Sequence, residues 1–414
     1  MWYRIFVLAL VSPCVAWAAD APLTLEAAVD QALKQAPEIA SSVATLDAAR
    51  AGAPSAGRLP DPELIAAVDN LPVNSDDRFS FTRDFMTMRR IGVMQSFPNG
   101  KKRRLESVRA QEEIGVAQAE LRKSEFDTAR AVSDSWIAAA VAIEAATRLR
   151  ELTPDVELQA TAARAALASG RTSAADALAM QTLAARLDDR IHQFDQEVDM
   201  RRAELARWIG RDADRPLAPL PVDRELGHSP QSLVAGVEQH APLAPLVARI
   251  AAARTDVELA RAEKRPDWSA ELSYAKRGSE FSDMISLEFR VGLPLFAAHR
   301  QDPLIAQKLS EVRAQEAERD GEVRMHTAEI RAAVTEWRHG RERLDGYKRE
   351  LLPLARERSR AAVASYGSGR GDLRTTIDAL SEEIDTRLDY VELEGVVARA
   401  WTFLHFLHDA GEQP

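Results

Sequence analysis

The chain has 414 residues, a formal net charge of −10 and a single cysteine, Cys14. The acidic balance argues against nucleic acid as a partner. One cysteine cannot build a disulfide framework or a cysteine-based metal site within the chain. Charged residues make up 29% of the sequence, and no stretch after residue 18 has the uninterrupted apolar length of a transmembrane helix.

The N-terminus predicts a secretory signal peptide over residues 1–18. Arg4 precedes a short apolar run, and the segment ends in Ala16-Trp17-Ala18 before Ala19. A lipoprotein with Cys14 lipidated is the alternative, although Pro13 stands where that motif expects a small residue.

The chain repeats itself at a distance of about 200 residues. Matching segments follow in the same order in both halves: Val108–Glu112 with Val312–Glu316, Arg130–Trp136 with Arg331–Trp337, and Leu167–Arg171 with Tyr366–Arg370. A unit of this length is a duplicated half-protein rather than a solenoid repeat. We therefore predict a first repeat over 19–215, a linker over 216–230, a second repeat over 231–410 and a tail over 411–414.

Each repeat is predicted to contain a helix, two strands and two long helices. The first has a helix over 24–58 that breaks or kinks at Pro37, strands over 63–70 and 86–97, and helices from Gly100 to about Ser169 and over 173–208. The longer helix, about 68 residues, would be about 100 Å long, with a kink at Pro154. The second has helices over about 231–264, 300–367 and 373–409, with strands between the first two.

The strands of the second repeat alternate between apolar and polar residues. Trp268, Leu272 and Tyr274 form the apolar side of one strand, and Ile285, Leu287, Phe289 and Val291 that of the next, where the alternation continues to Leu295. Two interpretations fit this pattern: a half-buried strand of a soluble sheet, or a barrel strand with one face toward lipid and the other toward a lumen.

A membrane location would require several copies of the chain. Four strands cannot close a barrel, since the smallest bacterial barrels have eight strands, and open sheet edges are not tolerated in lipid. A membrane protein with this sequence must therefore be an oligomer whose chains share one barrel.

The plan resembles the TolC-type outer-membrane efflux proteins over residues 22–410. The resemblance rests on Ile91–Pro98 and Val291–Phe296, where a strand meets a long helix, and on the helix breaks at 165–178 and 361–380. Residues 97–102 and 366–373 are most similar to the heavy-metal branch of CzcC- and CusC-type proteins.

This resemblance implies an α+β membrane protein, internally duplicated, with a long α-helical barrel and four β-strands per chain in a trimeric outer-membrane β-barrel. It implies a homotrimer, in outer-membrane lipid, that extends into the periplasm of a Gram-negative bacterium. The expected partners are a periplasmic adaptor protein and an inner-membrane pump of the RND type. The expected function is passive export of heavy-metal cations, without catalysis or cofactor.

Three acidic residues are the pore or gate residues that the resemblance implies: Asp372, Asp378 and Asp176. Asp378 corresponds to the family acid at the periplasmic constriction, although Ser381 stands where some members have a second acid. Three copies on one axis would attract cations. The alternative for each is a solvated aspartate near a helix N-terminus, stabilised by the helix dipole.

The two helix breaks are predicted to contact the adaptor. Their residues are Gly170, Arg171 and Thr172 in the first repeat and Gly369, Arg370 and Gly371 in the second. The glycines permit the left-handed backbone that a helical hairpin requires.

No catalytic or metal-binding motif is evident. His405 and His408 lie one helical turn apart, but structural zinc needs four ligands. We expect Met86, Met88 and Met94 to fill the apolar face of a strand, and Glu382, Glu383 and Asp385 to form a solvated helix face. Two functional alternatives remain open: a soluble periplasmic coiled-coil interaction protein, and an outer-membrane channel for drugs or type I secretion.

Overall fold

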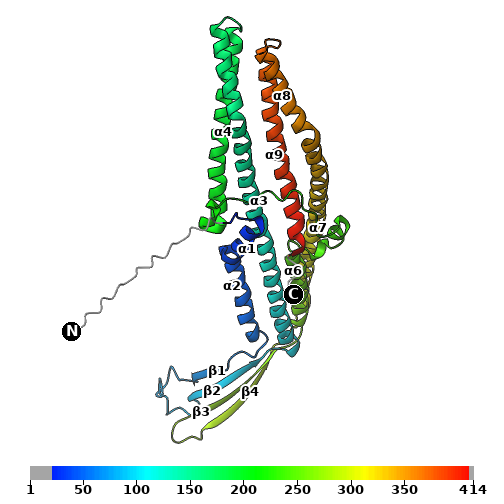
Figure 1. Cartoon of the computed structure of the whole chain (residues 1–414). Helices are drawn as coiled ribbons and strands as arrows, with labels where there is room; N and C mark the ends of the chain where they lie inside the picture. Colours follow the sequence, from blue (N-terminus) through cyan, green and yellow to red (C-terminus); the bar gives the residue numbers. More distant parts are fainter. Residues whose placement is uncertain (1–20, 410–414) are drawn as a thin grey trace, which may run out of the picture. The chain divides into compact units, whose positions relative to one another are not determined.

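The computed structural model of the protein describes residues 21–409 (Figure 1). The predicted signal peptide over 1–18 and the tail over 411–414 lie outside the described residues. In the described part, the chain is mostly helical and its strands form one four-stranded antiparallel sheet. The predicted combination of long paired helices with a hairpin from each repeat is confirmed.

The first repeat follows its predicted plan closely. Its elements are α1 Leu25–Gln35, α2 Pro37–Gly52, β1 Glu63–Asp69, β2 Met88–Phe97, α3 Gly100–Ala168 and α4 Ala174–Ile209. The Thr24 hydroxyl caps α1, accepting a hydrogen bond from the Ala27 amide at 3.2 Å. Pro37 separates α1 from α2 because it has no amide hydrogen to continue the first helix.

The second repeat has more interruptions than predicted. Its elements are α5 Pro230–Ala235, η3 Val237–Gln239, α6 Ala244–Ala262, β3 Trp268–Lys276, β4 Met284–Val291, α7 Gln301–Gly346, α8 Leu352–Gly367 and α9 Leu373–Asp409. The single helix expected over 231–264 is wrong. Gly236 and Pro242 lie in the interruption between α5 and α6, and both residue types disfavour a continuous helix.

Two other boundaries differ from prediction. Strand β4 ends at Val291 rather than continuing to Leu295, and Pro294 could not donate to a sheet ladder there. The helix expected over 300–367 contains a π-helical turn, Tyr347–Leu351, just before Pro353. In α3, the corresponding Pro154 lies inside an uninterrupted α-helix.

The chain forms two compact units, and both repeats contribute to each. The first unit contains the residues up to Lys34, Ala131–Arg224 and His339–Arg399. The second contains Gln35–Arg130, Glu225–Arg338 and the residues from Ala400 onward. The first unit therefore holds both turns between long helices, and the second holds the whole sheet.

In the first unit, the N-terminal segment is fixed against the long helices. Trp136 on α3 is fully buried, and its indole nitrogen donates to the Leu23 carbonyl at 3.2 Å. Leu23 also forms a parallel bridge with Leu217. On α9, the apolar residues Leu380, Ile384 and Val391 recur at helical spacing and are buried.

Two glycines allow α9 to approach its neighbours closely in the first unit. A Cβ on Gly395 of α9 would lie 2.7 Å from a methyl group of Val141 on α3. A Cβ on Gly340 of α7 would lie 2.4 Å from a methyl group of Val397 on α9. Interiors are packed too tightly to admit such atoms without movement of a neighbour.

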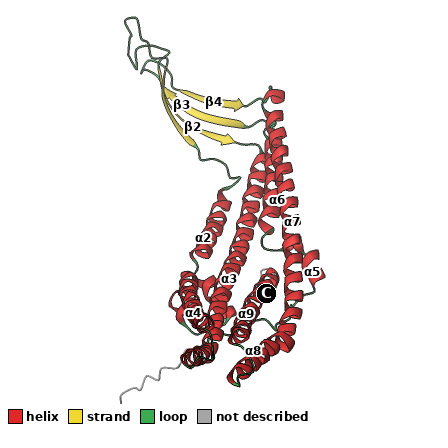
Figure 2. Cartoon of the chain, turned by 90° about the horizontal axis from the view of Figure 1, so that it is seen from above, coloured by secondary structure: helices red, strands yellow, loops and turns green. Residues whose placement is uncertain are grey.

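In the second unit, the strands pair in the order β1-β2-β3-β4, all antiparallel. Figure 2 shows β2, β3 and β4 lying side by side. The hairpins of the two repeats meet at the β2–β3 pair, where Val93 faces Leu272 and Phe97 faces Trp268. Strands β1 and β4 are the two edges of the sheet.

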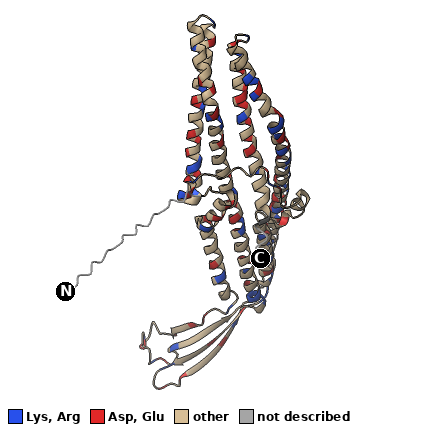
Figure 3. Cartoon of the chain, in the orientation of Figure 1, with Lys and Arg blue, Asp and Glu red and all other residues tan. Residues whose placement is uncertain are grey.

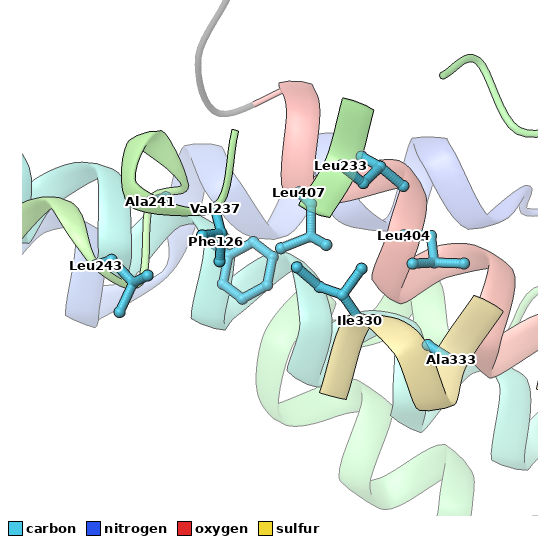
Figure 4. Packing of buried hydrophobic residues seen from close by; sticks show 9 residues of the cluster. All are labelled: Phe126, Leu233, Val237, Ala241, Leu243, Ile330, Ala333, Leu404 and Leu407. Atoms are coloured by element: carbon cyan, nitrogen blue, oxygen red, sulfur yellow. The ribbon is translucent and has the colours of Figure 1, made fainter. Parts of the chain in front are cut away.

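The helices of the second unit share a hydrophobic core. Its buried side chains come from α3, α5 and the segment after it, α7 and the end of α9: Phe126, Leu233, Val237, Ala241, Leu243, Ile330, Ala333, Leu404 and Leu407 (Figure 4). The interrupted segment between α5 and α6 thus contributes to the core despite its irregular backbone.

Candidate functional site: the sheet faces and the helical turns

One face of the sheet is apolar and exposed. All the predicted barrel-strand residues lie on it, with exposed fractions from 43% for Tyr274 to 76% for Ile285. Cross-strand pairs such as Leu272 with Leu287 make the surface continuous. Strands β1 and β2 extend it with Leu64, Val68, Ile91 and Val93, all exposed. A contiguous exposed apolar surface of this kind marks a protein or membrane contact.

The other face of the sheet carries an ion-pair network that crosses all four strands. Glu271 on β3 is 3% exposed and pairs with Arg90 on β2 at 2.7 Å and Arg290 on β4 at 3.1 Å. Arg90 also pairs with Asp69 on β1 at 2.8 Å, and Arg290 with Glu288 at 2.7 Å. Burial of the Glu271 carboxylate is compensated by its two guanidinium partners.

The sequence indicated these polar residues but not their pairing. Arg89 and Arg90 interrupt the apolar–polar alternation of β2 in the sequence, but their side chains point to opposite faces of the sheet. Gln95 does lie on the apolar face, where its amide nitrogen donates to the Pro60 carbonyl at 2.8 Å.

The predicted place of the strand methionines is wrong for two of them. Met88 and Met94 fall on the polar face with Arg90, and the Met94 sulfur accepts a hydrogen bond from Arg290 at 3.3 Å. The apolar positions of β2 are instead occupied by Ile91 and Val93. Met86 precedes β2 and is exposed.

In the first unit, the turn between α3 and α4 is built as the sequence predicted. Gly170 has a φ of +72°, and the Arg171 amide donates to the Ala166 carbonyl at 2.9 Å, which closes the end of α3. Ser173 caps α4: its hydroxyl accepts from the Asp176 amide at 3.0 Å and donates to the Asp176 carboxylate at 2.6 Å. The carboxylate of Asp176 therefore takes part in helix capping.

The turn between α8 and α9 repeats this arrangement. Gly369 has a φ of +74°, and the Arg370 amide donates to the Ser365 carbonyl at 3.0 Å. Asp372 caps α9 by accepting from the Thr375 amide at 2.6 Å. This backbone hydrogen bond lowers the pKa of the Asp372 carboxyl group, so the residue is ionised at neutral pH.

The two turns also hold their arginines in the same way. The Arg171 Nε donates to the Ser169 hydroxyl at 3.0 Å, and the Arg370 Nε donates to the Ser368 hydroxyl at 3.2 Å. Thr172 and Gly371 lie in the turns themselves, outside any helix. A Cβ on Gly371 would lie 2.6 Å from the Ser365 hydroxyl, so this glycine is also needed for space.

Asp378 has no local structural partner. It is exposed on α9, and it makes no hydrogen bond or ion pair with any residue that the structure describes. Of the three predicted pore acids, Asp176 and Asp372 cap helices, and Asp378 alone has a carboxylate uncommitted within the described chain. Their role at a pore stays a prediction.

The acidic run on α9 is not simply a solvated face. Glu383 is 4% exposed and accepts from Arg387 at 2.6 Å and from the Ser359 hydroxyl of α8. Asp385 pairs with Arg190 of α4 at 2.9 Å, and Arg387 also pairs with Glu151 of α3 at 3.2 Å. The acidic run and Arg387 together therefore link α9 to α8, α4 and α3.

No helix within residues 21–409 has the length and apolar character needed to cross a membrane. No cluster of three or more histidine, cysteine or carboxylate side chains in that range could hold a metal ion. Figure 3 shows charged residues along the helices and few on the sheet.

Residues 237–408 match the family model described as "Outer membrane efflux protein". The fold matches solved outer-membrane proteins over nearly the whole chain. VceC of Vibrio cholerae is 19% identical with a TM-score of 0.76, covering 94% of this chain and 96% of that one. The family model thus matches most of the second repeat, and the likeness to VceC shows a shared fold.

Other members of this structural group match equally well. CmeC of Campylobacter jejuni, described as an outer membrane channel, is 12% identical with a TM-score of 0.76, covering 94% of this chain and 86% of that one. CusC is 16% identical with a TM-score of 0.76, covering 92% and 90%. Because CusC is one of several such structures, the fold favours no single branch. No curated protein sequence matches the chain.

Proposed function

We propose that the protein is the outer-membrane channel of a tripartite efflux system, conducting its cargo passively from the periplasm to the outside. The observation that carries this proposal is the sheet with one exposed apolar face and one ion-paired polar face. A soluble sheet buries its apolar face against a core. A barrel in the outer membrane turns it toward lipid and turns the polar face toward a lumen.

The proposed assembly is a homotrimer. Strands β1 and β4 are edges of a four-stranded sheet, and unpaired strand edges are not stable in lipid. Pairing β4 of one chain with β1 of the next would close twelve strands from three chains. The exposure of every residue of β4 supports an edge that is completed by another copy.

The proposed partners are a periplasmic adaptor and an inner-membrane RND pump, which supplies the energy. The helical turns with Arg171 and Arg370 are the proposed adaptor contacts. Each guanidinium folds onto a turn serine, so it is presented at the end of a rigid hairpin. Replacing both arginines by alanine should reduce co-purification of the adaptor, and unchanged co-purification would place the contact elsewhere.

The proposed cargo is heavy-metal cations. The resemblance of residues 97–102 and 366–373 to the heavy-metal branch supports this, and CusC is among the matching structures. A strain that lacks the gene for this protein should become more sensitive to divalent and soft metal ions. Its sensitivity to dyes and detergents should not change. The reverse pattern would favour a drug channel.

The first experiment is fractionation and mass measurement of the mature protein in mild detergent. We expect a trimer that fractionates with outer membranes and begins at Ala19. A monomer or dimer released with the periplasmic contents would contradict the channel and favour the soluble coiled-coil interaction protein.

A further inference from the structure

Two basic residues lie side by side at the loop end of the apolar sheet face. Arg89 on β2 faces Lys276 on β3 in the strand register. Both side chains are exposed, and by the alternation of the strands they share the face of Ile91 and Tyr274. The Arg89 guanidinium donates to the Arg277 carbonyl at 3.3 Å, which holds it over the end of β3.

Neither cation has a carboxylate partner among the residues that the structure describes. This separates them from Arg90 and Arg290 on the opposite face, which pair with Asp69, Glu271 and Glu288. Asp283, just before β4, accepts a hydrogen bond from the Tyr274 hydroxyl and is paired with neither cation. Two unneutralised cations thus border an apolar surface.

The opposite end of the same face is aromatic. Phe97 stacks on Trp268 with ring centroids 4.1 Å apart. Between the Phe97–Trp268 and Arg89–Lys276 pairs, each strand advances eight residues (97 − 89 and 276 − 268). At about 3.3 Å per residue this is about 26 Å, or about 20 Å of depth at a barrel strand tilt. The apolar band of an outer-membrane barrel is about 25 Å tall.

We propose that Arg89 and Lys276 bind the phosphate groups of membrane lipids at the loop end of the barrel. The site rests on the proposed outer-membrane location, because only then does this face meet lipid. A guanidinium binds phosphate oxygens through two parallel hydrogen bonds, and an ammonium adds a point charge. The apolar residues below the pair contact the acyl chains of the same lipid, so the ligand is a lipid headgroup rather than free phosphate.

The test compares wild type with Arg89→Gln/Lys276→Gln in nanodiscs of phosphatidylcholine containing a minor fraction of phosphatidylglycerol. Native mass spectrometry then counts the lipids that remain bound. Each surface cation strengthens attraction to anionic lipid about fivefold, so the double variant should retain phosphatidylglycerol about 25-fold less. The control Arg78→Gln/Arg265→Gln removes the same charge from exposed residues outside the face, and should behave as wild type.

The outcomes separate this site from the function on which it rests. Wild-type protein that fails to insert into pure phosphatidylcholine vesicles would overturn the outer-membrane proposal. A double variant that inserts and retains phosphatidylglycerol as wild type does would overturn the lipid site alone. Full displacement of the lipid by millimolar inorganic phosphate would also overturn it, in favour of a free-phosphate site.

Discussion

At the scale of single residues, Asp372 and Asp378 share a predicted role at the pore but differ in their surroundings. Asp372 caps α9 through the Thr375 amide, so its replacement should also weaken the helix by about 1 kcal/mol. Asp378 has no partner among the described residues, so its replacement should leave folding unchanged. Asp378 is therefore the better position at which to test a pore charge.

We expect Asp378→Asn to reduce the cation preference of the reconstituted channel, because three copies of the carboxylate would act together on the axis. Ion selectivity in planar bilayers measures this. Asp199→Asn is a matched control, since Asp199 on α4 is also exposed and makes no hydrogen bond or ion pair with any described residue. Equal ion selectivity of the two variants would contradict the hypothesis that three copies of Asp378 attract cations at the pore.

The buried pair His240 and His326 predicts a pH-dependent stability. Their ring nitrogens, Nδ1 and Nε2, are 3.3 Å apart, and His326 Nδ1 lies 3.3 Å from a Glu329 carboxylate oxygen. Burial lowers the pKa of His326 despite Glu329, and nearby Arg130 acts in the same direction. Below about pH 6.5 the unfolded chain therefore binds a proton more readily than the native one.

The contribution of neutral His326 to the free energy of unfolding should thus be fully present above about pH 6.5. It should be lost as the pH falls, by at most about 1.4 kcal/mol per pH unit. Thermal unfolding of the detergent-solubilised protein between pH 7.5 and 5 measures this slope. We expect His326→Gln to unfold at a less pH-dependent temperature. An unchanged slope would assign the acid sensitivity to other groups.

At the scale of elements, the close contacts of α9 predict strict limits on residue size. Gly395→Ala would place a methyl group 2.7 Å from Val141, and overpacking of this kind costs about 1–3 kcal/mol. Gly321→Ala in α7 is the control, because no described atom beyond its own helical turn lies within 4 Å of its Cβ position. There, alanine should stabilise the helix by up to about 1 kcal/mol. The thermal unfolding temperature of Gly321→Ala should be higher than that of wild type, and that of Gly395→Ala should be lower.

The sequence correctly predicts helix boundaries and strand faces that are determined by residues close together in the chain. Pro37 separates two helices, Gly170 and Gly369 end others, and the alternation of β4 assigns Ile285 and Leu287 to one face. Local signals were insufficient where partners are distant in sequence. The pairing of Arg90 with Glu271 and the burial of Glu383 under Ser359 and Arg387 depend on contacts that no local pattern contains.

At the scale of the whole molecule, the proposed assembly in the membrane should depend on which face of the sheet carries a charge. Leu287→Arg places a cation near the middle of β4 on the proposed lipid face, at a cost of about 2–4 kcal/mol per chain. Ser286→Arg, on the polar face, should be tolerated. The trimer fraction extracted from outer membranes should fall for Leu287→Arg only, and equal fractions would contradict the assignment of the faces.

The open, fully exposed strand β4 has a consequence for how the protein is made. Before the proposed assembly, each chain would expose an apolar surface and two unpaired strand edges to water, a pattern that leads to aggregation. We therefore expect the newly made chain to need a chaperone until it inserts into the membrane. Pairing of the edge strands between chains would be the last step of assembly. Refolding without detergent or chaperone should give sheet-rich aggregates. A clear solution of monomers would contradict this and show that the helices alone prevent aggregation.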